Sequence, residues 1–337
     1  MTSRPLLLAL LLLLALAAGW TGFWHWSAGQ LETAVARFAD QQRARGLTVS
    51  YEGPEVSGFP IGLTAGFEAP LVAAPQGWRW AGPAVSGRAR VWSPFTIETD
   101  FPGLHRITLK PEPQAPDVDI EAEAEEASAW ARLRSDGQVD QGAIALGKLV
   151  VRSPLVGPSA AERLVGRYGP SRPGETAAGP EIDLAFEGVG LILPERIETP
   201  LGRQIESAIL EATLVGEILP GKPKQALARW REAGGKLEVM RLSTIWGPLQ
   251  LEAEGTASLD AQFRPIGAFQ TRIRGLAETL DALARAGVIE SGAVFAAQLA
   301  LAALGGDGES GLQVPVTLQE GRVFLGPVPI ARLSPVL

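Results

Sequence analysis

The feature that most constrains the fold is an unbroken alternation of small or apolar residues with polar residues from Leu249 to Gln262. Side chains of a β-strand point alternately to its two faces, so this period of two predicts a long strand with one buried face. After turn residues 264–267, the alternation resumes from Phe269 to Gly275. We therefore predict a β-hairpin over residues 249–275.

This hairpin has two different faces. On the polar face, we expect Glu252 and Glu254 to lie opposite Arg272 and Arg274. The small residues at the centre of the other face allow close packing by a helix, and they equally allow an acyl chain to lie along the strand. The sequence leaves open whether this face is a closed core or an open apolar trough. Its candidate residues are Leu249, Leu251, Ala253, Ala257, Leu259, Phe269 and Ile273.

The rest of the chain repeats the same pattern in shorter form. Alternating segments separated by Gly- and Pro-rich turns predict strands over residues 47–151, 182–193, 207–218 and 312–325. Capping signals predict short helices over residues 223–234, 276–286 and 292–304. A section rich in Pro and Gly over residues 153–180 is the expected seam between two sheet segments. We predict a mainly β (β-rich α+β) exported domain over residues 47–337, an extended, curved antiparallel sheet of hairpins with a few short covering helices.

The N-terminus predicts a membrane helix. No Asp, Glu, Lys or Arg occurs between Arg4 and Glu32. About 20 apolar residues in a helix span the roughly 30 Å hydrocarbon core of a bilayer, and Trp residues favour its interfaces. We predict a signal-anchor over residues 1–26 and a stalk helix over residues 27–46. The anchor residues are Leu6, Leu10, Leu13, Leu16, Trp20, Phe23, Trp24 and Trp26.

A cleaved secretory signal is the alternative interpretation of this N-terminus. Ala15-Leu16-Ala17 resembles a small-x-small cleavage site. An uncleaved anchor predicts a single-pass protein of the inner (cytoplasmic) membrane with its C-terminal domain in the periplasm. Cleavage predicts a soluble periplasmic protein. Both interpretations place residues 47–337 outside the cytoplasm.

Composition excludes several classes of function. Acidic residues outnumber basic ones by 37 to 30, giving a net charge of −7, so no basic footprint for nucleic acid is present. The absence of Cys excludes disulfides and thiolate catalysis. The only two His residues, His25 and His105, have no ligand or triad partner at motif spacing. We therefore predict no catalytic, cofactor-binding or metal-binding residues, and no cofactor.

Two local patterns resemble binding motifs. Residues 306–311 match G-x-G-x-x-G, but a predicted helix precedes them and a strand follows, which reverses the order of a dinucleotide site. A row of five carboxylates with strand spacing runs from Asp117 to Glu125. Calcium sites usually need a folded loop with mixed oxygen donors, so we interpret this row as a solvated face.

Five short segments carry a family resemblance. They are Ser50-Tyr51-Glu52-Gly53 through Val56-Ser57-Gly58-Phe59-Pro60, Gly77-Trp78-Arg79-Trp80, Trp92-Ser93-Pro94, Trp246-Gly247-Pro248-Leu249, and Gly321-Arg322-Val323-Phe324-Leu325-Gly326-Pro327-Val328-Pro329. In this order they resemble an uncharacterised bacterial membrane-anchored family, catalogued as domain of unknown function number twenty-one twenty-five. The resemblance implies one N-terminal membrane segment and a β-rich envelope domain, with no assigned activity. The layout is more loosely similar to AsmA-like envelope proteins, whose long sheets offer an apolar trough to lipid chains.

These observations predict a non-enzymatic, membrane-anchored envelope protein that handles lipid or maintains the envelope. One alternative is a scaffold or assembly partner that binds another envelope protein through its sheet edge or its Arg-rich face. A second alternative is an exported hydrolase that uses scattered carboxylates. The expected partners are therefore the membrane and either lipid or an envelope protein, with no nucleic acid.

Overall fold

The structure, a computed structural model, describes residues 3–75, 77–90, 92–110, 116–135, 138–171, 181–218, 223–288 and 311–336, with side chains from residue 10 onward. The predicted helix over residues 292–304 and most of the Gly-rich motif lie outside these residues. In the described part of the chain every strand pairing with a given register is antiparallel, and the helices are few. The predicted mainly β fold is confirmed.

The chain divides into two compact units. The first contains Met1–Val139 and Arg152–Leu155, and the second contains Asp140–Val151 and Val156–Leu337. In the first unit, β1 pairs with β2, β2 with β3 and β4, β3 with β6, β4 with β5, β5 with β8, and β6 with β7. Its elements are α1 (Ser3–Ala44), β1 (Thr48–Ser57), β2 (Gly62–Ala74), β3 (Trp78–Ala81), β4 (Val85–Arg90), β5 (Ser93–Asp100), β6 (Gly103–Leu109), β7 (Val118–Ala124) and β8 (Glu126–Leu133).

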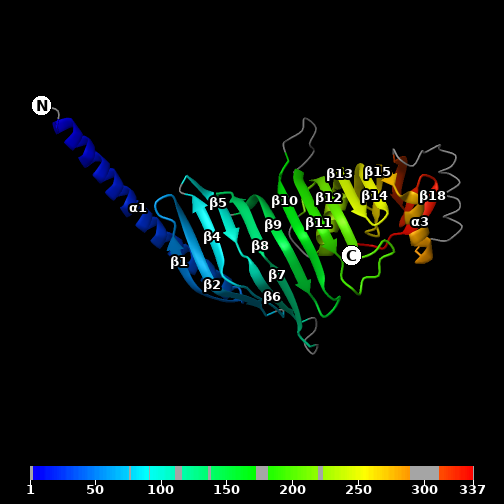
Figure 1. Cartoon of the computed structure of the whole chain (residues 1–337), viewed down its shortest axis with the longest axis horizontal. Helices are drawn as coiled ribbons and strands as arrows, with labels where there is room; N and C mark the ends of the chain where they lie inside the picture. The colour runs from blue at the N-terminus through cyan, green and yellow to red at the C-terminus, as the bar shows by residue number, and fades with distance from the viewer. Residues whose placement is uncertain are drawn as a thin grey trace. The chain divides into compact units, whose positions relative to one another are not determined.

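Helix α1 runs without a break from residue 3 of the predicted anchor to residue 44 of the predicted stalk, and its 42 residues span roughly 63 Å. Its C-terminal half packs against β1, while its N-terminal half extends beyond the strands of the first unit (Figure 1). The packed stripe follows helical spacing and consists of Trp24, Ala28, Leu31, Val35 and Ala39. Ala39 is only 2 % exposed, and its small side chain lets the helix lie close to the sheet.

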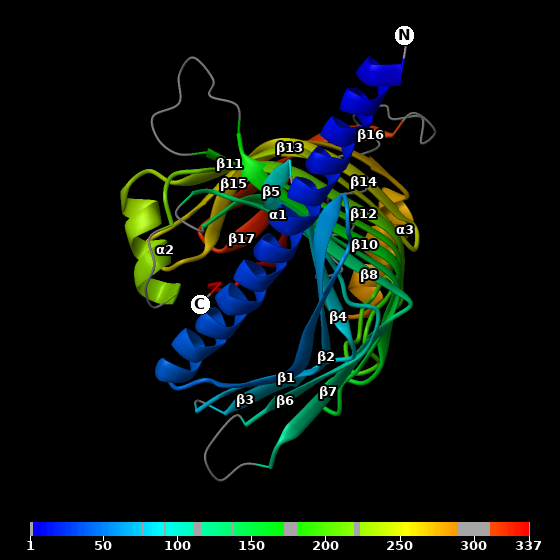
Figure 2. The ribbon, with the colours of Figure 1, turned by 90° about the vertical axis from the view of Figure 1, so that its left-hand side faces the viewer.

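The second unit is a meander in which each strand pairs with the next (Figure 1). Its strands bend strongly along their length (Figure 2). Its elements are β9 (Val139–Arg152), β10 (Ser159–Pro170), β11 (Glu181–Ile192), β12 (Gln204–Val215), α2 (Pro223–Glu232), β13 (Lys236–Trp246), β14 (Leu249–Leu259), β15 (Pro265–Arg274), α3 (Leu276–Arg285), β16 (Leu312–Gln319), β17 (Arg322–Leu325) and β18 (Val328–Arg332).

The predicted hairpin is formed by β14 and β15. Glu252 lies opposite Arg272, as predicted, and their side chains form an ion pair of 3.3 Å. Glu254 lies opposite Gln270 rather than Arg274. In the observed register Arg274 lies opposite Gln250, so only one of the two Glu residues faces an Arg.

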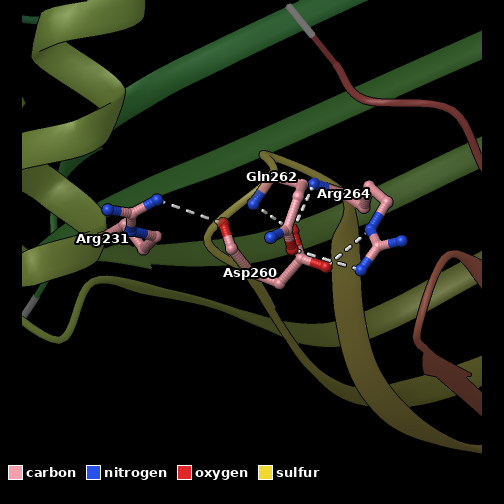
Figure 3. A network of polar contacts seen from close by, with 4 residues as sticks. All are labelled: Arg231, Asp260, Gln262 and Arg264. Atoms are coloured by element: carbon pink, nitrogen blue, oxygen red, sulfur yellow. Dashed lines mark hydrogen bonds and ion pairs between the residues drawn. The ribbon is translucent and has the colours of Figure 1, made fainter.

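The loop of this hairpin is held by Asp260 (Figure 3). Its carboxylate accepts hydrogen bonds from the backbone N–H groups of Gln262 and Arg264 at 2.8 and 2.9 Å, and from Arg264 Nε at 2.7 Å. Arg231 of α2 donates to the Asp260 carbonyl oxygen at 3.2 Å, which ties α2 to the loop. Burial alone raises the pKa of the Asp260 carboxyl, but the hydrogen bonds from Arg264 and Gln262 outweigh it and hold this pKa below its ordinary value.

The substitution Asp260→Asn is expected to make the second unit less sensitive to acid. A carboxyl whose pKa is lowered by folding stabilises the fold above its unfolded pKa of about 3.9, and this contribution disappears as the pH falls through the folded-state pKa. The variant should therefore be less stable than the wild type at pH 7, and the gap should narrow below about pH 4. Urea unfolding midpoints of both proteins at pH 7 and pH 3 measure the gap; a gap independent of pH contradicts this role.

Candidate functional site

Strand register places one apolar face across the whole second unit. Directly opposed residues of paired strands point to the same side, so a row of paired residues defines a face. One row, from β9 to β16, consists of Ile144, Gly166, Phe186, Leu210, Leu242, Ala253, Thr271 and Val314. The adjacent row on the opposite side runs through Ala145, Val165, Glu187, Ile209, Ser243, Glu252, Arg272 and Gln313, and it is polar from β13 to β16. The first row belongs to what we call the apolar face, and the second belongs to the polar face.

The apolar face is closed over β14 to β17. Helix α3 packs here through Leu276, Leu280 and Leu283, the stripe that its helical spacing favours. Leu280 is 1 % exposed and also contacts Ile330 of β18. Beneath them lies a cluster of three nearly buried side chains, against which the candidate residues Leu249 and Leu251 pack. The cluster consists of Ile273, Val314 and Leu325.

The small residues at the centre of β14 are covered by the neighbouring strand. A Cβ atom on Gly255 would lie 2.2 Å from the Ala268 carbonyl oxygen and 2.9 Å from Cδ1 of the Phe269 ring. Phe269 thus occupies the space that the glycine leaves, an arrangement in which an aromatic ring shields a glycine backbone. Ala253 is buried, and Ala257 and Leu259 are half-buried. The predicted groove residues therefore lie together in or beside a packed core.

The same face is open over β9 to β11. Ile144, Tyr168, Ile182 and Phe186 are between 38 and 43 % exposed. Register places Gly166 beside both Ile144 and Phe186, and Leu184 beside Tyr168. We call these four exposed side chains the open patch. Sequence alone does not single them out. Ile144, Ile182 and Phe186 fall in predicted strands like the covered ones, and Tyr168 falls in residues 153–180, where a seam was expected and the structure has β10.

The predicted anchor residues divide into two groups. Trp20, Phe23 and Trp26 are 39, 46 and 62 % exposed, and Leu10, Leu13 and Leu16 are also exposed. Trp24 is only 6 % exposed, and its Nε1 donates to the Gly62 carbonyl oxygen at 2.8 Å. Trp24 therefore joins α1 to β2. Leu6 lies in the part of α1 whose side chains are not described.

His105 and two members of the carboxylate row make local contacts in the first unit. His105 Nε2 lies 2.7 Å from the Phe101 carbonyl oxygen, and its ring stacks on Trp80. In the carboxylate row, Glu121 pairs with Arg106 at 2.8 Å, and Asp119 accepts a hydrogen bond from Thr108 at 2.6 Å. Among the described residues, no group of three His, Cys, Asp or Glu side chains could hold a metal ion.

The polar face carries a hollow of about 460 Å³. Its lining includes Met240, Glu254 and Gln270 together with the ion pair between Glu252 and Arg272. The charges of Glu252 and Arg272 already neutralise each other, and the remaining side chains make the wall of the hollow mostly polar. The hollow suits a polar contact and offers little to an acyl chain.

Comparisons with known proteins identify a family but no characterised relative. A family model described as an uncharacterized protein conserved in bacteria, DUF2125, matches residues 24–334. No curated protein and no solved structure matches the chain. The family description includes no activity, so function must be argued from the geometry.

Proposed function

Because the chain belongs to the DUF2125 family of uncharacterised bacterial proteins, we propose from its geometry a role as a non-enzymatic, membrane-anchored envelope protein. In this proposal the open patch of the second unit binds the acyl chains of phospholipids. The single observation that carries it is the exposure of four large apolar side chains on one face of the sheet.

The membrane anchor rests on α1. The helix is long and apolar enough to cross a bilayer, and its leucines from residue 10 to 16 are exposed. Arg4 before the apolar run favours an N-terminus that stays in the cytoplasm. We propose a single-pass protein of the inner membrane with residues 47–337 in the periplasm. Cleavage near Ala17 is the alternative, and sequencing the N-terminus of the mature protein distinguishes the two.

The chemistry of the open patch favours an acyl chain over a protein strand. Strands β10 and β11 are hydrogen-bonded on both sides, so they offer no free backbone groups to an added strand. Apart from the Tyr168 hydroxyl, an occupant of the open patch meets apolar side chains such as Phe186 and Ile144. A hydrocarbon chain satisfies this surface without leaving a polar group unpaired. An anchor in the membrane would keep such chains within reach.

Lipid retained by the full-length protein tests the proposal. We expect Phe186→Glu to lose most of the phospholipid found by mass spectrometry, because it places a carboxylate in the open patch. Ala185→Glu is the matched control, since it adds the same carboxylate on the neighbouring residue, which points to the opposite face. Lipid bound around α1 is common to both variants and cancels in the comparison.

Two results would contradict this role. One is an equal lipid content in wild type, Phe186→Glu and Ala185→Glu. The other is a wild-type protein that retains no more phospholipid than a peptide of α1 alone, together with a protein neighbour crosslinked at the open patch. The second result would favour the scaffold function.

A further inference from the structure

Two exposed apolar turns lie at the same end of the first unit. The turn between β1 and β2 exposes Phe59 and Ile61 by 52 and 59 %, and the turn between β4 and β5 exposes Trp92 by 67 %. Phe95, at the start of β5, is 55 % exposed. Gly62 pairs with Arg90, so the two turns adjoin. We call these four side chains the rim.

Hydrogen bonds fix the position of the rim along α1. Trp20 Nε1 donates to the Pro60 carbonyl oxygen at 2.9 Å, and Trp24 packs edge-on against Phe59 with ring centroids 5.6 Å apart. Twenty residues of membrane-spanning helix counted from Pro5 end at Trp24, and Trp20 lies four residues, or about 6 Å, before that boundary. If α1 spans a bilayer, the turn that binds Trp20 lies at the level of the interface.

The side chains at this level suit the interfacial layer of a membrane. Aromatic rings prefer the region of the lipid headgroups, and Phe23 and Trp26 of α1 are exposed beside the rim. A pocket of about 300 Å³ is lined by Phe23, Trp24, Trp26, Leu63 and Arg90, among others. Arg90 is the only charged residue among those lining it, and its guanidinium pairs with Glu98 at 3.1 Å. Apolar walls with one Arg at the edge match a phospholipid, whose acyl chain lies next to an anionic phosphate.

We propose that the rim is a membrane-docking surface that sits in the interfacial layer of the bilayer holding α1 and contacts phospholipid there. This inference rests on the proposed membrane anchor. Its occupant is the lipid surface, because the bonds from Trp20 and Trp24 hold the turn at bilayer height. Docking at a second point besides the helix restrains the first unit against rotation about α1.

Single cysteines test the rim, since the chain has none of its own. Ile61→Cys places a label at the rim. Trp78→Cys is the control: Trp78 is 39 % exposed and pairs with Ala74, which the full length of β2, roughly 40 Å of extended strand, separates from Gly62. The full chain is labelled with a nitrobenzoxadiazole fluorophore and reconstituted in vesicles of phosphatidylethanolamine and phosphatidylglycerol that carry a nitroxide near the headgroup.

We expect the nitroxide to quench the label at position 61 several-fold more than the label at position 78. Phe95→Cys reports on the start of β5, next to the second turn, and should behave like position 61. Equal quenching at the three positions in protein that resists carbonate extraction overturns the rim and leaves the anchor intact. Release of the wild-type chain by carbonate overturns the anchor and the rim together.

Discussion

Replacing Gly275 by alanine is expected to lower the free energy of unfolding of the second unit by about 3 kcal/mol. Gly275 joins β15 to α3 with a φ of +66°, a left-handed conformation that side chains with a Cβ rarely adopt. A Cβ atom here would lie 1.9 Å from the Pro248 carbonyl oxygen, which is backbone and cannot turn aside. The substitution must displace α3 and with it Leu280, the most buried large side chain of the closed region.

Gly287 provides a matched control for this substitution. It follows α3 with a φ of +70°, and a Cβ atom placed on it would meet nothing within 4 Å. Gly287→Ala should therefore cost only the conformational penalty, about 1 kcal/mol. Urea unfolding of both variants, with hydrogen exchange in α3 to locate the change, measures the difference. Equal losses would show that contact with Pro248 does not limit the packing of α3.

The substitution Trp24→Ala is expected to detach the C-terminal half of α1 from β1 and β2. Removing a buried Trp costs about 3 kcal/mol or more, and here the Gly62 carbonyl oxygen also loses its indole donor. Because 1.4 kcal/mol corresponds to a tenfold change in an equilibrium constant, amides of residues 28–44 should exchange about 100-fold faster.

Trp26 is the control for Trp24. It lies two residues further along the same helix and is 62 % exposed, so Trp26→Ala removes an aromatic side chain without opening the helix–sheet contact. We expect exchange of residues 28–44 in this variant to match the wild type. Similar protection in Trp24→Ala and the wild type would mean that the stripe of Ala28, Leu31, Val35 and Ala39 holds the helix without the indole.

Local pattern predicted much of the strand structure. The alternation predicted both strands of the hairpin, now β14 and β15, and the C-terminal strand over Leu312–Gln319. A turn at Glu320 and Gly321 follows that strand. These predictions succeed because strand period and turn residues are properties of neighbours in sequence. The helical stripe of Leu276, Leu280 and Leu283 is predictable for the same reason.

Sequence could not show which part of the apolar face is covered. The cover over β14 to β17 comes from α3 and from Ile330, which lies far along the chain. Strands β11 and β14 both alternate, yet Phe186 is 40 % exposed while Ala253 is 9 % exposed. The four aromatic residues near the end of the anchor are likewise equivalent in sequence. The Gly62 carbonyl oxygen and the ring of Phe59, both contacted by Trp24, set it apart in the fold.

The closed core and the open patch thus occupy different parts of one face. The closed part supplies burial that stabilises the second unit. In the open part, Phe186 and its neighbours keep apolar surface in contact with water. Covering that surface with an apolar ligand lowers the free energy. In this proposal, the hairpin of β14 and β15 supports the fold, and lipid binding belongs to β9, β10 and β11.

A photoreactive amino acid at position 186 or 187 of the full-length protein in living cells tests this claim most directly. The two positions are adjacent on β11 but point to opposite faces of the sheet. We predict that irradiation attaches a phospholipid to the protein at position 186 and not at position 187, as read from the mass of the crosslinked peptide. Lipid adducts of equal yield at both positions, or a protein adduct in place of lipid at position 186, would contradict acyl-chain binding by the open patch.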